Sequence, residues 1–419
     1  MLDIKIIRNN PELVKDIIQK RNMKLDVEAF LELDKKRTQL IIKTDELRAL
    51  KNTVSKEIPT LSNDEKPAKI AEMKKVSDDL KVLEEEQNEI EANWKTEYYK
   101  FPNLLDETTA IGPTEDDGVV EYTFGEKTKF DFEPKAHYEI GAAKDWIDTE
   151  KGSEVSGARF WYLKGDVVLL QMAIMNFAIT KLISKGFTPI LPPVLVREKA
   201  MFGTGFFPAD EDGIYAVNPG DDDLYLVGTS EVPVTSYHMG ETLDLSEPKK
   251  YVAYSACFRR EAGSAGKDMK GILRGHQFDK VEMVTFCKPE DSKKMHDFMS
   301  GVEQEVWEDL GIPYQKVNIA SGDLGNPAMK KYDLEAWMPG QNKYREVTSC
   351  SNVGEFQSRR LGIKCKNNEN ETVFAHTLNG TVTAIGRCLI AIIENYQTAE
   401  GNVKIPEVLV PFMGGKTEI

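Results

Sequence analysis

The sequence predicts an α+β protein, with a helical N-terminal region and a larger body on a mostly antiparallel β-sheet flanked by helices. Residues 1–100 read as helix throughout, with apolar residues at heptad spacing. From Phe101 onward, glycine and proline separate short apolar and β-branched runs such as 118–124, which is typical of strands. One long apolar helix pattern spans about Gly165–Ser184. We therefore divide the chain into residues 1–100 and residues 101–419.

The N-terminal region is expected to begin with a short helix and to continue as a long one. Asn10 followed by Pro11 is a helix-start signal, and this helix is expected to end near Lys20. The next helix is expected from about Asp26 to Ile58. Apolar residues recur on it every seven positions, at Leu33, Leu40, Leu47 and Val54.

A turn by composition spans 59–67 and joins this helix to a second long one. The seam of the second helix steps alternately by three and four residues, at Met73, Val76, Leu80, Leu83, Gln87, Ile90 and Trp94. Two heptad helices joined by a short turn form an antiparallel hairpin. We thus predict a coiled-coil arm over about 27–98, and about 32 residues per helix make it roughly 45–50 Å long.

The arm carries basic side chains on an acidic protein. The formal net charge is −15, so any RNA binding must rest on a local patch. The basic residues are Lys35, Lys36, Arg37, Lys43, Arg48 and Lys51 on the first helix, and Lys69, Lys74, Lys75 and Lys81 on the second. They fit either an ordinary solvated coiled-coil face or an RNA contact, and acidic neighbours at 84–86 favour the solvated face on the second helix.

Composition also bears on location and redox state. We find no run of about 18 apolar residues and no signal-peptide apolar region, so we expect no membrane partner and a cytoplasmic protein. The cysteines lack framework and zinc-ligand spacing, so we expect reduced, structural thiols. They are Cys257, Cys287, Cys350, Cys365 and Cys388.

The stretches richest in chemistry flank a glycine-bearing loop. Phe258–Gly263 and Arg274–Glu282 are predicted to be two strands joined by a long loop, with arginine on each side. Arginine forks suit phosphate oxygens, and Phe278 could stack on a base. Neither a P-loop nor G-x-G-x-x-G is present, so phosphate would be held by arginines. The pattern also fits a surface hairpin with salt bridges, and His276 fits a base or a structural histidine.

Three further polar clusters accompany apolar runs. They are Thr229-Ser230-Glu231, Arg345–Asn352, and Asn379-Gly380-Thr381 with Gly386-Arg387. Each cluster alone would fit a turn, a helix cap or an edge strand. Together with the arginine-flanked loop they indicate one site on one sheet.

In these motifs the chain resembles the class II aminoacyl-tRNA synthetases, and among them the bacterial-type seryl-tRNA synthetases. Motif 1 resembles 186–193, motif 2 Phe258–Glu282 and motif 3 Asn379–Arg387, while Thr229-Ser230-Glu231 is similar to the family's serine-binding loop. The arm and the C-terminal 405–415 also match, so the resemblance covers essentially the whole chain. It implies an ATP-dependent serine–tRNA ligase whose partners are L-serine, tRNA(Ser) and tRNA(Sec).

The resemblance implies roles for the ATP side of the site. Arg259 would grip the α-phosphate and the serine carboxylate, and Arg387 would be the second catalytic arginine. Glu261 would read the adenine amino group while Phe278 stacks on the ring. Arg274 and Arg387 would hold the terminal phosphate. The remaining ATP-binding positions are Arg260, Val347, Thr348 and Ser349, and Glu346 with Ser349 would coordinate Mg²⁺.

For the amino acid, the resemblance implies that Glu231 pairs with the serine ammonium. Glu282 and Thr381 would hydrogen-bond the serine hydroxyl, and the remaining serine-binding positions are Thr229, Ser230 and Arg259. Two departures from the family pattern stand out. Val382 follows Thr381 where a small residue is common, and is expected to narrow that wall. Lys270, in 267–271, stands where arginine is common and loses the fork.

The resemblance further implies a homodimer through motif 1, with the long apolar helix before Pro192 as the shared surface. It implies that the arm grips the long variable arm of serine tRNA across the dimer. Two other functions remain open at this point. An amino-acid:carrier-protein ligase would lack the arm, and a non-catalytic coiled-coil adaptor would lack the complete Arg259, Glu261, Glu346 and Arg387 set.

Overall fold

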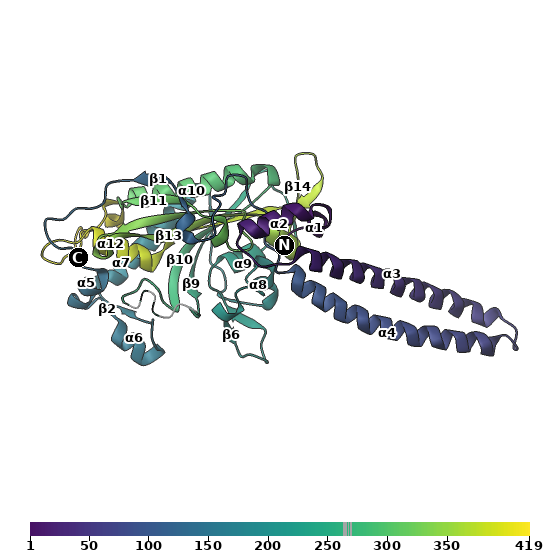
Figure 1. Ribbon diagram of the computed structural model, residues 1–419. Coiled ribbons are helices and arrows are strands. Elements are labelled where there is room, and N and C mark those ends of the chain that lie inside the picture. The colour runs from purple at the N-terminus through teal and green to yellow at the C-terminus, as the bar shows by residue number, and fades with distance from the viewer. Residues whose placement is uncertain (263–265, 267, 269) are drawn as a thin grey trace. The chain divides into compact units, whose positions relative to one another are not determined.

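The computed structural model describes residues 1–262, 266, 268 and 270–419, which divide into two compact units (Figure 1). One unit comprises Leu2–Gln19 and Met23–Phe101, and the other comprises Met1, Lys20–Asn22 and Pro102–Ile419. Of the predicted motif 2 loop, Gly263, Lys267 and Met269 lie outside the described residues.

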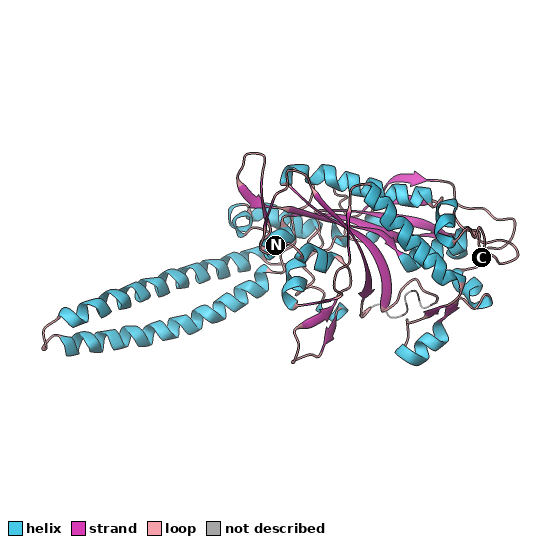
Figure 2. Cartoon of the chain, turned by 180° about the vertical axis from the view of Figure 1, so that it is seen from behind, coloured by secondary structure: helices cyan, strands magenta, loops and turns pink. Residues whose placement is uncertain are grey.

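The N-terminal unit is a helical hairpin preceded by short helices. Its helices are α1 (Ile4–Asn9), α2 (Pro11–Lys20), α3 (Val27–Glu57) and α4 (Lys66–Tyr98). Asp26 caps α3 by accepting a hydrogen bond from the Ala29 amide at 2.9 Å. Figure 2 shows α3 and α4 side by side and joined by a tight turn, so the predicted coiled-coil arm is confirmed.

Several of the arm's buried residues lie on the predicted seam, namely Leu40 and Val54 on α3, and Met73, Leu80 and Trp94 on α4. Thr44 is also buried, although it does not lie on the predicted seam of α3. Asp34 is buried as well, which the heptad pattern did not predict. Its carboxylate accepts hydrogen bonds from Arg8 at 2.7 and 2.8 Å and from the Trp94 indole at 2.9 Å. A charge buried at the base of the hairpin is therefore fully paired.

The basic side chains of α3 fall into two groups. Arg37 pairs with Glu91 at 2.5 Å, Arg48 pairs with Glu84 at 2.8 Å, and Lys51 donates to Ser77 at 3.0 Å. The second group is Lys35, Lys36 and Lys43, which are exposed and have no partner among the described side chains. Of the six predicted basic residues on α3, three therefore hold the hairpin together and three face solvent.

The body is built on an eight-stranded sheet in the order β1-β11-β12-β13-β16-β10-β9-β4. All neighbours are antiparallel except β4 and β9, as predicted for this α+β fold. In that order the strands are Val119–Phe124, Tyr314–Asn318, Lys330–Met338, Lys343–Gly354, His376–Ala384, Gln277–Cys287, Lys249–Phe258 and Thr188–Ile190. The minor sheets pair β2 (Ile147–Asp148) with β3 (Tyr162–Leu163), β8 (Thr242–Leu243) with β14 (Lys364–Lys366) and β15 (Thr372–Phe374), and β7 (Leu224–Leu226) with β5 (Leu195–Val196) and β6 (Tyr215–Val217).

Three helices pack on one face of the sheet, namely α7 (Asp166–Ser184), α10 (Ser292–Asp309) and α12 (Ile385–Asn395). Strand alternation divides the side chains between two faces. Met283 and Leu378 enter this core, and their neighbours Glu282 and Asn379 point to the opposite face, here called the site face. The remaining helices are α5 (His137–Ala143), α6 (Thr149–Ser156), α8 (Glu198–Thr204), α9 (Glu231–Ser236) and α11 (Phe356–Leu361).

Helix α7 corrects the expectation about apolar runs. By length and composition it could cross a membrane, which the sequence reading excluded. In the body it is a core helix whose inner side, including Leu170, Ile174 and Leu182, is fully buried. Its outer side leaves Leu169 and Ile183 each 48% exposed and Met172 44% exposed. The sequence reading located this helix at about 165–184 but did not count it as long and apolar enough to cross a membrane.

All five cysteines are buried and unpaired. Burial raises the pKa of the Cys287 and Cys388 thiols to about 12, so both stay protonated near neutrality. The cysteines therefore act as small apolar side chains in the core.

Candidate active site

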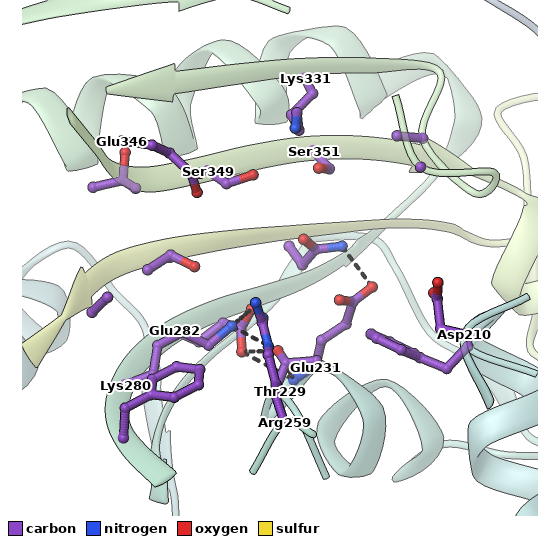
Figure 3. Close-up of a pocket in the computed structure, with 18 of the residues that line it drawn as sticks. Asp210, Thr229, Glu231, Arg259, Lys280, Glu282, Lys331, Glu346, Ser349 and Ser351 are labelled. Carbon is purple, nitrogen blue, oxygen red and sulfur yellow. Dashed lines mark hydrogen bonds and ion pairs between the residues drawn. The ribbon is translucent and has the colours of Figure 1, made fainter. Parts of the chain in front are cut away.

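A cavity of about 510 Å³ opens on the site face of the sheet and gathers most of the predicted residues (Figure 3). Strands β10, β12, β13 and β16 form its floor, and α9 and the loop before it form one wall. The predicted residues that line it are Thr229, Glu231, Arg259, Glu261, Arg274, Phe278, Glu282, Glu346, Val347, Thr348, Ser349, Thr381 and Arg387. Sequence segments more than 150 residues apart thus contribute to one site.

Two β-bulges aim these side chains. Between β12 and β13 the register skips Val347, because Leu334 pairs with Thr348 and Glu335 with Glu346. Residues three apart on a regular strand point to opposite faces, but this bulge brings Glu346 and Ser349 to the same one. A second bulge skips Val382 between β10 and β16 and sets Thr381 directly opposite Glu282. The placement of Glu346 with Ser349 therefore depends on the bulge at Val347, and the placement of Thr381 opposite Glu282 depends on the bulge at Val382.

Glu282 is the centre of a buried polar network. One carboxylate oxygen accepts hydrogen bonds from the Thr229 hydroxyl at 2.6 Å, the Ser230 hydroxyl at 2.8 Å and the Glu231 amide at 3.1 Å. The other accepts from Lys280 at 2.9 Å, and Lys280 also donates to Thr229 at 2.7 Å. Although burial opposes ionisation, Lys280 and the hydroxyls hold the pKa of Glu282 below its usual value. Glu282 is thus an ionised, immobilised acceptor.

Glu231 lies in the same cavity but in a different electrostatic state. One of its carboxylate oxygens accepts hydrogen bonds from the side-chain amides of Gln357 at 2.7 Å and Asn379 at 2.9 Å. Burial first, and then the negative charge of Glu282, raise the pKa of Glu231 to about 7. The pocket therefore holds one carboxylate that is ionised throughout and one that gains its charge near neutral pH.

Two of the three arginines of the site pair with carboxylates that share the cavity. Arg274 donates to Glu261 at 2.6 Å, and Arg387 donates to the Glu346 backbone carbonyl at 2.8 Å, with its carboxylate at 3.3 Å. Arg259 donates to the Gly228 carbonyl at 3.2 Å, and its guanidinium lies 5.3 Å from the Phe278 ring centre. Three guanidinium groups around one cavity form a cradle suited to a polyphosphate.

The residues present fit a magnesium ion bound together with phosphates. Desolvation would raise the pKa of Glu346, but Arg387, Lys331 and Arg259 outweigh it and keep the carboxylate ionised. Ser349 provides a hydroxyl on the same side of β13. Within the described part of the chain, no three His, Cys, Asp or Glu side chains form a metal-binding group. One carboxylate and one hydroxyl suit Mg²⁺, which usually takes one or two protein ligands alongside substrate phosphates and water.

Three expectations need correction. Arg260 does not line the cavity, because alternation along the chain turns its side chain away from that of Arg259. Ser230 is fully buried behind the wall and reaches the site only through Glu282. Val382 narrows no wall, because it follows Thr381 on the strand and therefore points to the opposite side, into the core, where it is fully buried. Lys270 lies 5.4 Å from the Tyr138 ring centre, and the prediction that it loses the arginine fork stays a prediction.

Several contributors were missed by the sequence reading. Lys280 carries a usable signal, since in Lys280-Val281-Glu282 the two charged residues share one face of a strand. Asn379 was recognised only as part of a motif. Gln357 on α11 and the wall segments 204–210 and 324–328 carry no local pattern, because only the fold brings them to the cavity.

Comparison with protein families finds two matches along the chain. The model of the seryl-tRNA synthetase N-terminal domain matches residues 1–105. The model of the class II tRNA synthetase core domain, which covers the G, H, P, S and T enzymes, matches residues 215–396. The two matches fall on the arm-bearing unit and on the sheet that carries the cavity.

Similar proteins extend over the full length. A serine–tRNA ligase from Rhodococcus jostii is 44% identical over 416 residues, covering 99% of both chains, and one from Thermodesulfovibrio yellowstonii is 42% identical over 421 residues, with the same coverage. Among solved structures, seryl-tRNA synthetase from Pyrococcus horikoshii complexed with ATP has a TM-score of 0.90 at 38% identity, covering 100% of this chain and 99% of its own. The Naegleria fowleri cytoplasmic enzyme with AMP has a TM-score of 0.86 at 36% identity, covering 100% and 98%.

Proposed function

The chain belongs to the seryl-tRNA synthetase family, and from that membership we propose that its cavity activates L-serine with ATP and transfers it to tRNA(Ser). The observation that carries the proposal is the combination of an arginine cradle with two differently charged carboxylates in one cavity. Phosphate-binding and amino-acid-binding groups adjoin there, as adenylate formation requires.

In the first step, a serine carboxylate oxygen attacks the α-phosphorus of ATP, and the bond to the leaving pyrophosphate breaks. Arg259 binds the α-phosphate and the serine carboxylate, which brings the two reacting groups together. Arg274 and Arg387 take the terminal phosphates in exchange for their present carboxylate partners. Glu346 and Ser349 would hold Mg²⁺, which supplies positive charge to the phosphate oxygens when bound. Once Arg274 has moved to the phosphates, Glu261 accepts a hydrogen bond from the adenine amino group. The adenine ring stacks on Phe278.

In the second step, the ribose hydroxyl at the tRNA 3′ end attacks the serine carbonyl carbon, and AMP leaves. No covalent enzyme intermediate is needed. The chain's contribution is positioning and electrostatic stabilisation by groups already in place.

Serine selectivity is assigned to Glu282 and Thr381, which face each other across β10 and β16. A site built to bind a hydroxyl can reject the analogue that lacks it by about 10⁴–10⁵-fold. Glu231 is assigned to the ammonium group, because its pKa near 7 allows it to ionise beside a cation.

The proposal is tested by ATP–pyrophosphate exchange with each amino acid in turn. Serine alone is expected to support exchange, and the reaction should require Mg²⁺. Arg259→Ala should lower exchange by about 10²–10³-fold, the scale of one lost charge-stabilising contact. Lys294→Ala, an exposed cation on α10, serves as the charge-matched control and should leave exchange unchanged. Near-normal exchange in the Arg259 variant would refute the assignment.

Residues 1–100 are proposed to be the tRNA-binding domain and residues 101–419 the catalytic domain. Replacing 27–98 with a short linker should leave serine-dependent exchange nearly intact and abolish tRNA charging. Equal charging by the armless protein would reject this division. We further propose that tRNA(Sec) is a substrate, which charging of a tRNA(Sec) transcript with serine would test. We also propose that the enzyme is a homodimer and that it is located in the cytoplasm.

A further inference from the structure

A second cavity of about 470 Å³ adjoins the active site on the other side of residue 260. We call it the side cavity, and six of its lining residues carry the argument: Glu198, Phe207, Glu211, Tyr215, Tyr225 and Arg260. The Arg260 amide donates to the Gly213 carbonyl at 2.9 Å, and the Arg259 amide donates to the His276 carbonyl at 2.9 Å. Consecutive arginines, with Cα atoms about 3.8 Å apart, therefore enter neighbouring cavities.

The side cavity combines aromatic faces with unpaired charges of both signs. Phe207 and Tyr225 meet edge to face at 4.9 Å, and Tyr215 lies 6.3 Å from the His276 ring, which in turn lies 5.3 Å from Phe160. No side chain in the part of the chain that the structure describes pairs with the Arg260 guanidinium or with the carboxylates of Glu198 and Glu211. These groups remain available to a ligand.

Aromatic side chains beside an arginine are the usual means of binding an unpaired nucleobase. The two carboxylates narrow the choice, because they accept hydrogen bonds from an exocyclic amino group and repel a carbonyl oxygen. Cytosine offers that amino donor, with carbonyl and ring-nitrogen acceptors beside it for a guanidinium. A phosphate would be disfavoured next to two carboxylates.

We propose that the side cavity binds an unpaired cytosine of the CCA sequence that ends tRNA, with Tyr215 stacking on the base and Arg260 donating to its carbonyl edge. The inference rests on the proposed function, because transfer requires the terminal ribose to enter the active-site cavity. The preceding nucleotides must then lie beside its mouth, and the side cavity is one residue away. Arg260, which adenylate formation leaves without a direct role, gains a place in the transfer step.

The test compares two reactions and two kinds of transcript. Arg260→Ala and Tyr215→Ala should leave serine-dependent pyrophosphate exchange unchanged and lower kcat/KM for tRNA charging by about tenfold, the scale of one lost base contact. Tyr215→Phe retains the ring and Lys294→Ala removes a distant charge, so both controls should charge normally. Replacing the contacted cytosine with uracil should cost the unmodified enzyme about tenfold. It should cost a variant that combines Glu198→Ala with Glu211→Ala nothing further, because these carboxylates accept from the amino group that uracil lacks.

Different outcomes separate the possible errors. If the Arg260→Ala and Tyr215→Ala variants both charge tRNA normally, or if uracil costs the variant lacking both carboxylates as much as the unmodified enzyme, the cytosine contact is wrong. If exchange falls together with charging, the residues support the active site instead, and the inference is also overturned. Failure of the unmodified protein to charge any serine tRNA would reject the proposed function itself, and the inference with it.

Discussion

If Glu231 binds the serine ammonium as proposed, this one residue couples amino-acid binding to pH. Its pKa is raised to about 7, mainly by burial, so below that pH the carboxylate is neutral and attracts an ammonium weakly. KM for serine should therefore fall as pH rises through about 7, and Glu231→Gln should give a high KM that no longer varies in that range. Pyrophosphate exchange at saturating ATP from pH 6 to 8.5 measures this. An unchanged pH profile in the variant would assign the titration to another group.

The raised pKa of Glu231 also makes the stability of the folded state depend on pH. Stability falls as pH rises, whereas serine binding strengthens. The unfolded carboxyl titrates near 4.5 and the folded one near 7, so the folded state retains the proton longer. Glu231's contribution to stability is therefore complete below about 4.5 and is lost as pH rises towards 7. Removing the titratable group in Glu231→Gln should flatten the free energy of unfolding in that window, which urea denaturation at several pH values can establish.

The Glu282–Lys280 pair makes a separate prediction about stability. Glu282 is 2% exposed and Lys280 is 5% exposed, and they bond at 2.9 Å. Glu282→Ala leaves a buried ammonium without its carboxylate, so the free energy of unfolding should fall by about 3–5 kcal/mol. Adding Lys280→Met should restore much of the loss, as measured by urea denaturation. A stable single variant would mean that water replaces the carboxylate.

At the scale of elements, the two groups of cations on α3 predict two different phenotypes. Reversing the charge of Lys35, Lys36 and Lys43 should weaken tRNA binding and reduce its salt dependence, because these cations are free to release counterions on RNA. Arg48→Ala should mainly loosen the hairpin, because Arg48 is paired with Glu84. Filter binding at several salt concentrations separates the two effects. Equal loss from both changes would indicate that the arm acts through its shape alone.

The elements also show where sequence reasoning succeeds and where it stops. Heptad spacing located the arm because a coiled coil is a local, periodic structure: Leu40, Leu80 and Trp94 are buried as expected. Strict alternation failed at the bulge in β13, which brought Glu346 onto the same face as Ser349. Arg260 was misplaced for a related reason, since a motif names neighbouring residues but does not say which face each one takes. Gln357 reaches the site through tertiary packing alone.

At the scale of the whole molecule, the outer side of α7 is the proposed isologous surface. Leu169, Met172 and Ile183 are each close to half exposed on one helix, an apolar patch of the kind that pairs between subunits. We expect the unmodified protein to be a dimer, and Leu169→Glu combined with Met172→Glu should make it a monomer of about 47 kDa, as light scattering at micromolar concentration would show. A species of unchanged mass would move the interface elsewhere.

The exposed side of α7 has a thermodynamic consequence as well. If that side is covered only in the assembled form, association adds to the stability of the folded state by mass action, and dilution removes that contribution. The melting temperature would then rise with the protein's own concentration, and the charge-bearing α7 variant would melt at one temperature at every dilution. Each subunit's resistance to unfolding would thus depend on how much of the protein the cell makes.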